Sequence, residues 1–318
     1  MTAPAVTDVS PVADFSHEAF LYSEPAEFLE GTISFVREGL QLDESVLVAV
    51  PGQRVGWLRD FFADEPDVAL FDMSELGANP ARIIPAWQDF LGRNLARGRS
   101  VRGVGEPIWS GRSAAEIAEC QQHESLLNLA FGEGPGWRLL CPYDVSALPG
   151  EVIDQARVTH PVVVTGGDRS GSELYHHVLP SRALRGQPLP PPAEAPIELA
   201  FTVGDLSSVR RIVARRCAEL GLAEEVTDDL TLAVDEVASN SLLHGGGRGV
   251  LRVWCEPDTL VCEVVDDGVI ADPLVGRQRP SVDRIGGRGI WLANQLCDLV
   301  QVRSGAAGTV VRVHVRLP

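Results

Sequence analysis

The sequence predicts an α/β protein of two domains, and three observations support this. A chain of 318 residues, 45% of them hydrophobic, exceeds one ordinary domain and can bury two cores. Six prolines lie between Pro180 and Pro196, a composition that favours extended chain and excludes a helix or a central strand. The hydrophobic pattern differs on the two sides of that segment. We therefore expect domains at residues 14–180 and 197–318, joined by a linker at 181–196.

In the first half, β-branched runs alternate with helical patterns, the order typical of a mainly parallel sheet covered by helices. Strands are expected at residues 45–51, 68–73, 100–107, 137–144 and 161–167. Helices are expected near residues 26–39, 80–97 and 113–131.

The second half predicts an α/β sandwich, with helices on one side of a largely antiparallel sheet. A strand at 197–203 precedes helices from about Ser207 to Leu220 and from Thr227 to His244. A hairpin, a helix and two strands follow, at 250–256 with 259–266, at 289–299, and at 300–304 with 309–317.

Composition excludes several classes of function. A net charge of −17 argues against direct nucleic-acid binding. All basic residues are arginine, which excludes a Walker A loop, a Schiff-base lysine and a lysine general base. No apolar run reaches the about 18 residues that a membrane span needs, and the N-terminus does not resemble a signal peptide, so we expect a cytoplasmic protein without membrane contact. Six cysteines without CxxC pairs indicate reduced, buried thiols.

Three polar residues, Glu236, Asn240 and His244, stand at steps of four within the predicted helix of VDEVASNSLLHGG. Side chains at this spacing form one row along a helix. Such a row is either an ordinary set of helix-surface contacts or the lining of a pocket.

Glycine-rich segments downstream favour the pocket. EVVDDGV ends an apolar strand in Asp266, Asp267 and Gly268, and GGRG at 286–289 opens a helix. Glycines at a helix start let backbone N–H groups approach phosphate oxygens, and the helix dipole favours the anion. Taken with the polar row, these segments predict a nucleotide site that needs no lysine.

Residues 197–318 resemble the GHKL, or Bergerat, ATP-binding fold, and within it the anti-sigma-factor serine/threonine kinases. The matching motifs are VDEVASNSLLHG, VVDDG, GGRG and GTVVRVHV. The resemblance implies ATP and Mg²⁺ as cofactors, with Glu236 as general base, Asn240 as magnesium ligand and Asp266 as acceptor for the adenine amino group. The other ATP-binding residues that it implies are His244, Gly268, Gly287, Arg288, Gly289 and Thr309, the last as a support for Asp266.

One feature near this site departs from the family pattern, and the role of another stays open. Val269 and Ile270 stand where many relatives carry a further glycine, which affects the loop on the adenine side. Four arginines in or beside the loop from Val269 to Gly287 could reach phosphates or a protein partner: Arg277, Arg279, Arg284 and Arg288. We expect the first two to be ordinary solvated side chains.

The resemblance implies a serine/threonine protein kinase that regulates transcription, with a sigma factor or an anti-sigma-factor antagonist as partner and a homodimer as a possible assembly. The alternative is an ATP-binding protein that sequesters its partner without catalysis. The presence of Glu236 favours the enzyme, because sequestration needs no general base. A histidine kinase would need an upstream helical hairpin with a phosphoacceptor histidine, and His17 does not qualify.

The first half resembles the MEDS sensory domain, a RecA-like sheet without a Walker A loop. The motifs are HEAFLY, FVREGL, RGVGEPIW, HESLLN, LLCPYDVSALP and THPVVV. This implies sensing of a ligand that the sequence does not identify, without ATP hydrolysis.

The ligand pocket is expected at the carboxyl ends of the strands, where such sheets bind ligands. Its candidate residues are Glu106, Trp109, His123, Glu124, Asn128, Tyr143 and Asp144. A metal site is the alternative for Cys120, His123, Cys141 and His160, which are residue types that bind metals. Their spacing fits no closed zinc pattern, which favours buried core residues.

Overall fold

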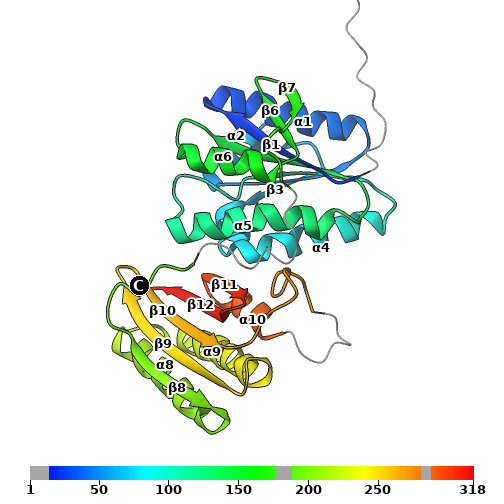
Figure 1. The fold of residues 1–318 in the computed structure, drawn as a ribbon. Helices are drawn as coiled ribbons and strands as arrows, with labels where there is room; N and C mark the ends of the chain where they lie inside the picture. The colour runs from blue at the N-terminus through cyan, green and yellow to red at the C-terminus, as the bar shows by residue number, and fades with distance from the viewer. Residues whose placement is uncertain (1–13, 177–187, 281–287) are drawn as a thin grey trace, which may run out of the picture. The chain divides into compact units, whose positions relative to one another are not determined.

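The structure is a computed structural model that describes residues 14–176, 188–280 and 288–318. Its contacts divide the chain into two compact units, each considered by itself (Figure 1). Unit 1 comprises Met1–Phe71, Leu91–Trp109 and Leu127–His176. Unit 2 comprises Asp72–Phe90, Ser110–Leu126 and His177–Pro318. The domain boundary proposed at 181–196 thus lies within unit 2, and two segments from the first half of the chain belong to unit 2 as well.

Unit 1 is built on a seven-stranded sheet in the order β3-β2-β4-β5-β1-β6-β7. The pairs β2–β4, β4–β5, β5–β1 and β1–β6 are parallel, and β6–β7 is antiparallel. The prediction of a mainly parallel sheet is confirmed. The strands are β1 (Ser16–Tyr22), β2 (Ser45–Val50), β3 (Val68–Asp72), β4 (Val101–Gly105), β5 (Arg138–Asp144), β6 (Val162–Thr165) and β7 (Asp168–Gly171).

Helix α1 illustrates how the sequence specifies the helices of unit 1. Pro25 occupies its first turn, and Glu24 and Glu27 form a capping box. Phe28 and Val36 on its buried face pack in the same hydrophobic cluster as the β2 valines. The helices of the first half are α1 (Pro25–Gln41), α2 (Gly52–Arg59), α3 (Met73–Leu76), α4 (Ile83–Leu95), α5 (Ala114–Phe131) and α6 (Gly150–Thr159), with a 3₁₀ turn η1 (Pro80–Arg82).

Five elements of the first half were not predicted, namely β1, α2, α3, α6 and β7. Strand β1 lies inside the sheet, yet its sequence SHEAFLY begins with polar residues that a buried strand normally lacks. Glu18 is fully buried there because the guanidinium groups of Arg138 and Arg169 neutralise it, at 2.8 and 3.0 Å. These arginines keep the pKa of Glu18 below its ordinary value against the effect of burial. The local sequence pattern of β1 does not show that distant arginines pair with Glu18.

Unit 2 contains a five-stranded sheet in the order β11-β12-β10-β9-β8, with antiparallel neighbours throughout. This confirms the predicted α/β class. The elements are β8 (Ile197–Thr202), a 3₁₀ turn η2 (Val203–Asp205), α8 (Leu206–Glu219), α9 (Glu224–His244), β9 (Arg248–Glu256), β10 (Thr259–Asp266), α10 (Gly289–Leu296), β11 (Leu299–Gly305) and β12 (Gly308–Arg316).

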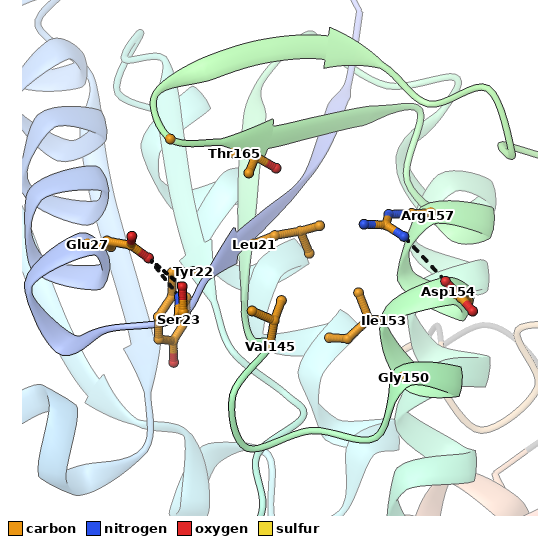
Figure 2. A pocket seen from close by; sticks show the side chains of 11 residues that line it. Leu21, Tyr22, Ser23, Glu27, Val145, Gly150, Ile153, Asp154, Arg157 and Thr165 are labelled. Atoms are coloured by element: carbon orange, nitrogen blue, oxygen red, sulfur yellow. Dashed lines mark hydrogen bonds and ion pairs between the residues drawn. The ribbon is translucent and has the colours of Figure 1, made fainter.

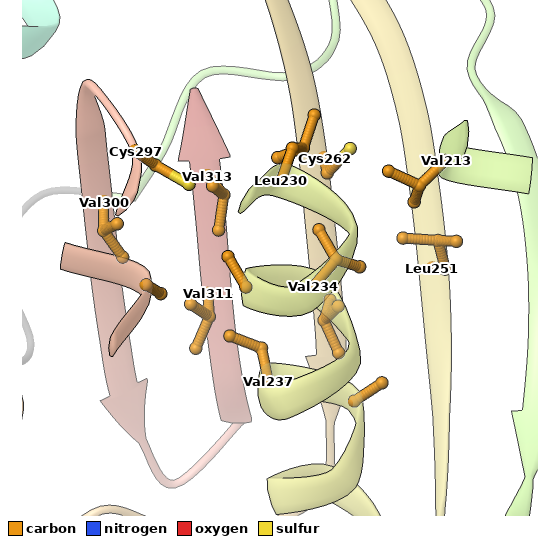
Figure 3. Close-up of a cluster of buried hydrophobic side chains, with 14 of the residues drawn as sticks. Val213, Leu230, Val234, Val237, Leu251, Cys262, Cys297, Val300, Val311 and Val313 are labelled. Carbon is orange, nitrogen blue, oxygen red and sulfur yellow. The ribbon is translucent and has the colours of Figure 1, made fainter. Parts of the chain in front are cut away.

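The core of unit 2 positions α9 on the sheet. Leu230, Val234 and Val237 form its buried stripe and pack in one cluster with strand residues such as Val311 and Val313 (Figure 3). The spacing of three and four residues puts these apolar side chains on one side of the helix. The neighbouring polar row is therefore held at the border of this core.

All six cysteines are free, and five of them are buried. Within the described parts of the chain, no helix has both the length and the apolar character needed to cross a membrane.

Candidate functional site

The polar row of α9 borders the start of α10. Glu236 and Asn240 are half-buried, and His244 is exposed as the last residue of the helix. A Cβ placed on Gly289 would lie 2.6 Å from Asn240 Nδ2 and 3.2 Å from Glu236 Oε2. A side chain at position 289 would therefore displace the ends of these two side chains. The structure brings together Glu236, Asn240 and Gly289, the last residue of GGRG.

Helix α10 begins at Gly289, with Arg288 at its N-cap. The first N–H groups of a helix have no partner within the helix and attract anions. Arg288 is exposed at this end, so its side chain is accessible from solvent. Gly287 lies outside the described residues.

Asp266 ends β10, and two hydrogen bonds orient its carboxylate. Oδ1 accepts from the backbone N–H of Gly268 at 2.7 Å, and Oδ2 accepts from the Ser241 hydroxyl at 2.6 Å. A carboxylate accepts about four hydrogen bonds, so two positions remain for a ligand. Sequence reasoning missed Ser241. Its position directly after Asn240 on α9 could have identified it, because that position turns the hydroxyl toward the sheet.

Two glycines allow α9 to end against the loop after Asp266. A Cβ on Gly245 would lie 2.4 Å from Asp266 Cγ, and one on Gly268 would lie 2.7 Å from the His244 carbonyl oxygen. His244 therefore contributes backbone packing at this junction, while its side chain faces solvent.

Thr309 supports the same loop. It pairs with Asp266 across β10 and β12. Its hydroxyl donates to the carbonyl oxygen of Gly268 at 2.8 Å and lies 2.8 Å from the Ser304 hydroxyl. Thr309 thus fixes the loop backbone beyond Asp266, and Ser241 bonds the carboxylate itself.

The arginines of the loop differ from one another. Arg277, expected in solvent, is buried within unit 2, and its guanidinium donates to Glu119 at 3.0 Å. Burial lowers the pKa of Arg277, and the Glu119 carboxylate opposes that effect. Arg279 is exposed as expected and pairs with Asp89 at 3.0 Å. Arg284 lies outside the described residues.

The seven residues expected to line one pocket in the first half separate into groups. Tyr143 and Asp144 are successive residues of β5, so their side chains point to opposite faces. Asp144 lies with Glu106 at the carboxyl edge of the sheet, whereas Tyr143 stacks edge-on against His160 with ring centroids 5.6 Å apart. The four others belong to other elements: His123, Glu124 and Asn128 are residues of α5, and the half-buried Trp109 follows β4.

The group at the carboxyl edge is a buried polar cluster centred on Arg54. Its guanidinium pairs with Glu106 and donates to Asp144 at 3.2 Å, while the Tyr22 hydroxyl donates to Glu106 at 3.4 Å. Burial raises the pKa of Glu106 to about 8, although the Arg54 charge opposes this shift. Burial beside this carboxylate also raises the pKa of Tyr22. Arg54, on the unpredicted helix α2, was missed by the sequence analysis.

A cavity of about 510 Å³ opens at the same edge (Figure 2). Leu21, Val145 and Ile153 form an apolar wall, and Arg157 pairs with Asp154 at 3.3 Å at its side. None of the seven predicted residues belongs to the lining as described. Strand ends β1, β5 and β6 frame the cavity, so its place agrees with the expectation for a parallel sheet although its residues do not.

Comparisons with known proteins match both halves of the chain. The family of the MEthanogen/methylotroph, DcmR Sensory domain, MEDS, matches residues 16–161. The histidine kinase-like ATPase domain family matches residues 199–315. A curated relative, the anti-sigma F factor of Clostridium acetobutylicum, is 30% identical over 109 residues, which cover 31% of this chain and 75% of the relative.

The matched ATPase region contains every residue of the α9, β10 and α10 site, from Glu236 to Thr309. The motifs singled out in the sequence and the matched regions thus agree on both halves. The chain therefore belongs to the anti-sigma-factor family of histidine kinase-like ATPase domains, and it carries a MEDS sensory domain ahead of that domain.

Proposed function

We propose that this protein is an ATP-dependent serine/threonine protein kinase of the anti-sigma-factor type, controlled by its sensory domain and acting on transcription through a protein partner. The observation that carries the proposal is the meeting of Glu236 and Asn240 at Gly289, beside the oriented carboxylate of Asp266. The partner is a sigma factor or its antagonist, as the name of the curated relative suggests.

The residues present fit Mg²⁺ and ATP. Gly289 leaves room beside the Asn240 amide, whose oxygen is of the kind that Mg²⁺ prefers, and the N-terminus of α10 suits phosphate. Asp266 retains acceptor positions for an adenine amino group. Bound ATP would supply the phosphoryl group and the metal would neutralise its charge.

The side chains of this chain have separate tasks in the proposal. Glu236 accepts the proton of the substrate hydroxyl, and Asn240 holds the metal. Ser241 and the Gly268 N–H keep Asp266 in the orientation that accepts a hydrogen bond. Phosphoryl transfer depends mainly on such positioning and on charge neutralisation, so this set suffices without lysine.

The second candidate function is sequestration of the partner without catalysis. Leu232 and Leu243 favour partner binding, because these large apolar side chains of α9 are 44% and 75% exposed. Binding through this face is compatible with both functions. The two differ in whether the captured protein becomes phosphorylated.

The test begins with capture of the partner from native cell extract, with and without ATP, and then measures phosphate transfer to its serine or threonine. We expect Glu236→Gln to keep ATP affinity and to lose transfer by about 10²–10⁴-fold, because a carboxamide cannot accept the hydroxyl proton. Asp235→Asn is the matched control on the same helix, since Asp235 pairs with Arg210 instead of facing Gly289.

Two further variants separate binding from catalysis. Asn240→Ala should weaken Mg²⁺-ATP binding itself, and Asp266→Asn should weaken nucleotide binding by about 1–3 kcal/mol. A wild-type transfer rate in Glu236→Gln would make Glu236 structural. A partner that wild-type protein captures but never phosphorylates would establish sequestration instead.

A further inference from the structure

Two segments of the MEDS-matched sequence, Asp72–Phe90 and Ser110–Leu126, belong to unit 2 together with the proposed ATP site. The first segment contains the 3₁₀ turn η1, in which Asn79 is the N-cap residue and Arg82 is the last residue. Asn79 is fully buried, and Arg82 is half-buried. Neither residue was among the predicted site residues, because both act on α10 through contacts that the sequence motifs do not indicate.

Arg82 binds the carboxyl end of α10. Its Nε donates to the carbonyl oxygen of Asn294 at 2.7 Å. Its Nη2 donates to the carbonyl oxygens of Gln295 and Cys297 at 2.9 and 3.0 Å. The last carbonyl groups of a helix have no partner within it, and a cation at this end also interacts favourably with the helix dipole. Arg82 thus caps α10 from outside the helix.

Asn79 connects α10 to the segment that follows β10. Its Nδ2 donates to Asn294 Oδ1 at 3.1 Å and to the Cys297 carbonyl oxygen at 3.3 Å. Asn294 in turn donates its own Nδ2 to the Gly276 carbonyl oxygen at 3.0 Å. Gly276 has a φ of 71°, and a Cβ there would lie 2.8 Å from that Nδ2, so its backbone passes close to α10. Hydrogen bonds therefore join η1, α10 and this segment.

The second MEDS-matched segment holds the residue next to Gly276. Glu119 of α5 is 1% exposed and accepts from the Arg277 guanidinium at 3.0 Å. It also pairs with Arg303 of β11 at 2.8 Å, so two arginines neutralise this buried carboxylate. The start of the loop before α10 is thus fixed from two sides, at Gly276 by α10 and at Arg277 by α5.

The opposite end of α10 borders the proposed catalytic side chains. Gly289 is the first residue of α10, and the space beside it is enclosed by Glu236 and Asn240. An α-helix rises about 1.5 Å per residue, so α10 is a rod of about 12 Å whose two ends move together. A change of tilt at its carboxyl end would displace Gly289. A misplacement of about 1 Å at a reacting centre can lower a rate about 100-fold.

We propose that Asn79 and Arg82 are positioning residues for phosphoryl transfer, an inference that rests on the kinase function proposed above. They fix α10 at its carboxyl end and thereby hold Gly289 against the polar row of α9. Release of η1 from α10 slows transfer, so these hydrogen bonds are where the sensory sequence acts on the ATP site. Nucleotide affinity depends less on them, because Ile290 and Ala293 also hold α10 in the hydrophobic core.

The test measures kcat and KM for ATP in phosphate transfer to the captured partner, with the full-length protein. We expect Arg82→Ala and Asn79→Ser to lower kcat at least tenfold, while KM for ATP changes less than fivefold. Asn79→Ser keeps an oxygen that can cap η1 and removes the amide that donates to α10. Arg82→Lys retains a cation with N–H donors and should recover part of the rate. The matched control is Arg316→Ala, which should keep the wild-type kcat although it breaks a 2.9 Å pair with Glu116 of α5.

Amide hydrogen exchange in the full-length protein without nucleotide gives a readout that needs no kinase activity. The backbone N–H groups of α10 should exchange at least tenfold faster in Arg82→Ala than in wild type or Arg316→Ala, and those of α8 should not change. Unchanged exchange in α10, or wild-type kcat in both Arg82→Ala and Asn79→Ser, would overturn the positioning role. Equal acceleration in α8 would also overturn it, because the substitution would then loosen unit 2 as a whole. A wild-type protein that never phosphorylates its partner would overturn the kinase function instead, and α10 exchange would still show whether η1 holds the helix.

Discussion

The carboxyl edge of the unit 1 sheet and the α9–α10 region of unit 2 use polar side chains in opposite ways. In unit 1, Glu106 is fully buried, and Arg54 and Tyr22 of the same unit bind its carboxylate. In unit 2, Glu236 and Asn240 are half-buried against Gly289. Within the described ranges, neither of these two side chains has a hydrogen bond to another residue.

This difference shows which polar groups serve the fold and which remain available. A buried carboxyl group whose partners lie in its own unit serves the specificity of packing there. A half-buried carboxylate beside a glycine retains its acceptor capacity for a ligand. Gly289 leaves space beside Glu236 and Asn240, because a Cβ at that position would occupy it.

The largest expected effect concerns pH and the buried carboxyl of unit 1. Burial raises the pKa of Glu106 from 4.5 to about 8, so between these values the folded protein holds a proton that the unfolded chain releases. Stability should therefore fall as pH rises from about 5 through 8, by up to about 4 kcal/mol from this group. Glu106→Gln keeps the shape and removes this dependence. Urea unfolding at pH 5 and pH 8.5 would measure it, and identical pH dependence in both proteins would contradict the assignment.

A smaller effect is expected from filling the space beside Glu236. A side chain at Gly289 would collide with Asn240 Nδ2, 2.6 Å from the Cβ position. We expect Gly289→Val to weaken Mg²⁺-ATP binding by roughly 10–100-fold, about 1.4–2.8 kcal/mol. The control is Gly204→Ala, because a Cβ there meets nothing within 4 Å. Titration calorimetry would decide, and unchanged affinity in Gly289→Val would move the nucleotide elsewhere.

The Ser241 hydroxyl should have an effect of about 1 kcal/mol on nucleotide affinity, the usual net value of one hydrogen bond. It donates to Asp266 at 2.6 Å, and Ser241→Ala would leave only the Gly268 N–H to orient the carboxylate. Thr227→Ala serves as control, since Thr227 bonds the Ala223 carbonyl at the far end of α9. If both variants bind ATP as wild type does, Asp266 needs no such support.

The smallest effect tests the proposed domain boundary. A fragment of residues 196–318 contains every residue assigned to the ATP site, so its Mg²⁺-ATP affinity should lie within about 1 kcal/mol of the full-length value. Unit 2 also contains Asp72–Phe90 and Ser110–Leu126, and the fragment lacks Glu119, the partner of the buried Arg277. Calorimetry on both proteins compares them directly. An insoluble fragment, or one that does not bind ATP, would show that these segments complete the unit.

Local pattern was sufficient for much of the fold and for the nucleotide site. Helices α1, α8 and α9 and the β9–β10 hairpin follow from apolar periodicity, which is a property of neighbouring residues. The motif residues Glu236, Asn240 and Asp266 stand out for the same reason. They are polar residues within otherwise apolar segments. Their positions follow from the helix and the strand that contain them.

Tertiary structure alone decided the features that depend on partners far along the chain. Strand β1 is buried although it begins with His17 and Glu18, because Arg138 and Arg169 neutralise the carboxylate from more than 100 residues away. A separation of 52 residues likewise hid Arg54 beside Glu106, and one of 124 residues hid His17 beside Cys141. A buried charge or ligand is stable only beside its partner, and the chain order does not reveal which strands become neighbours.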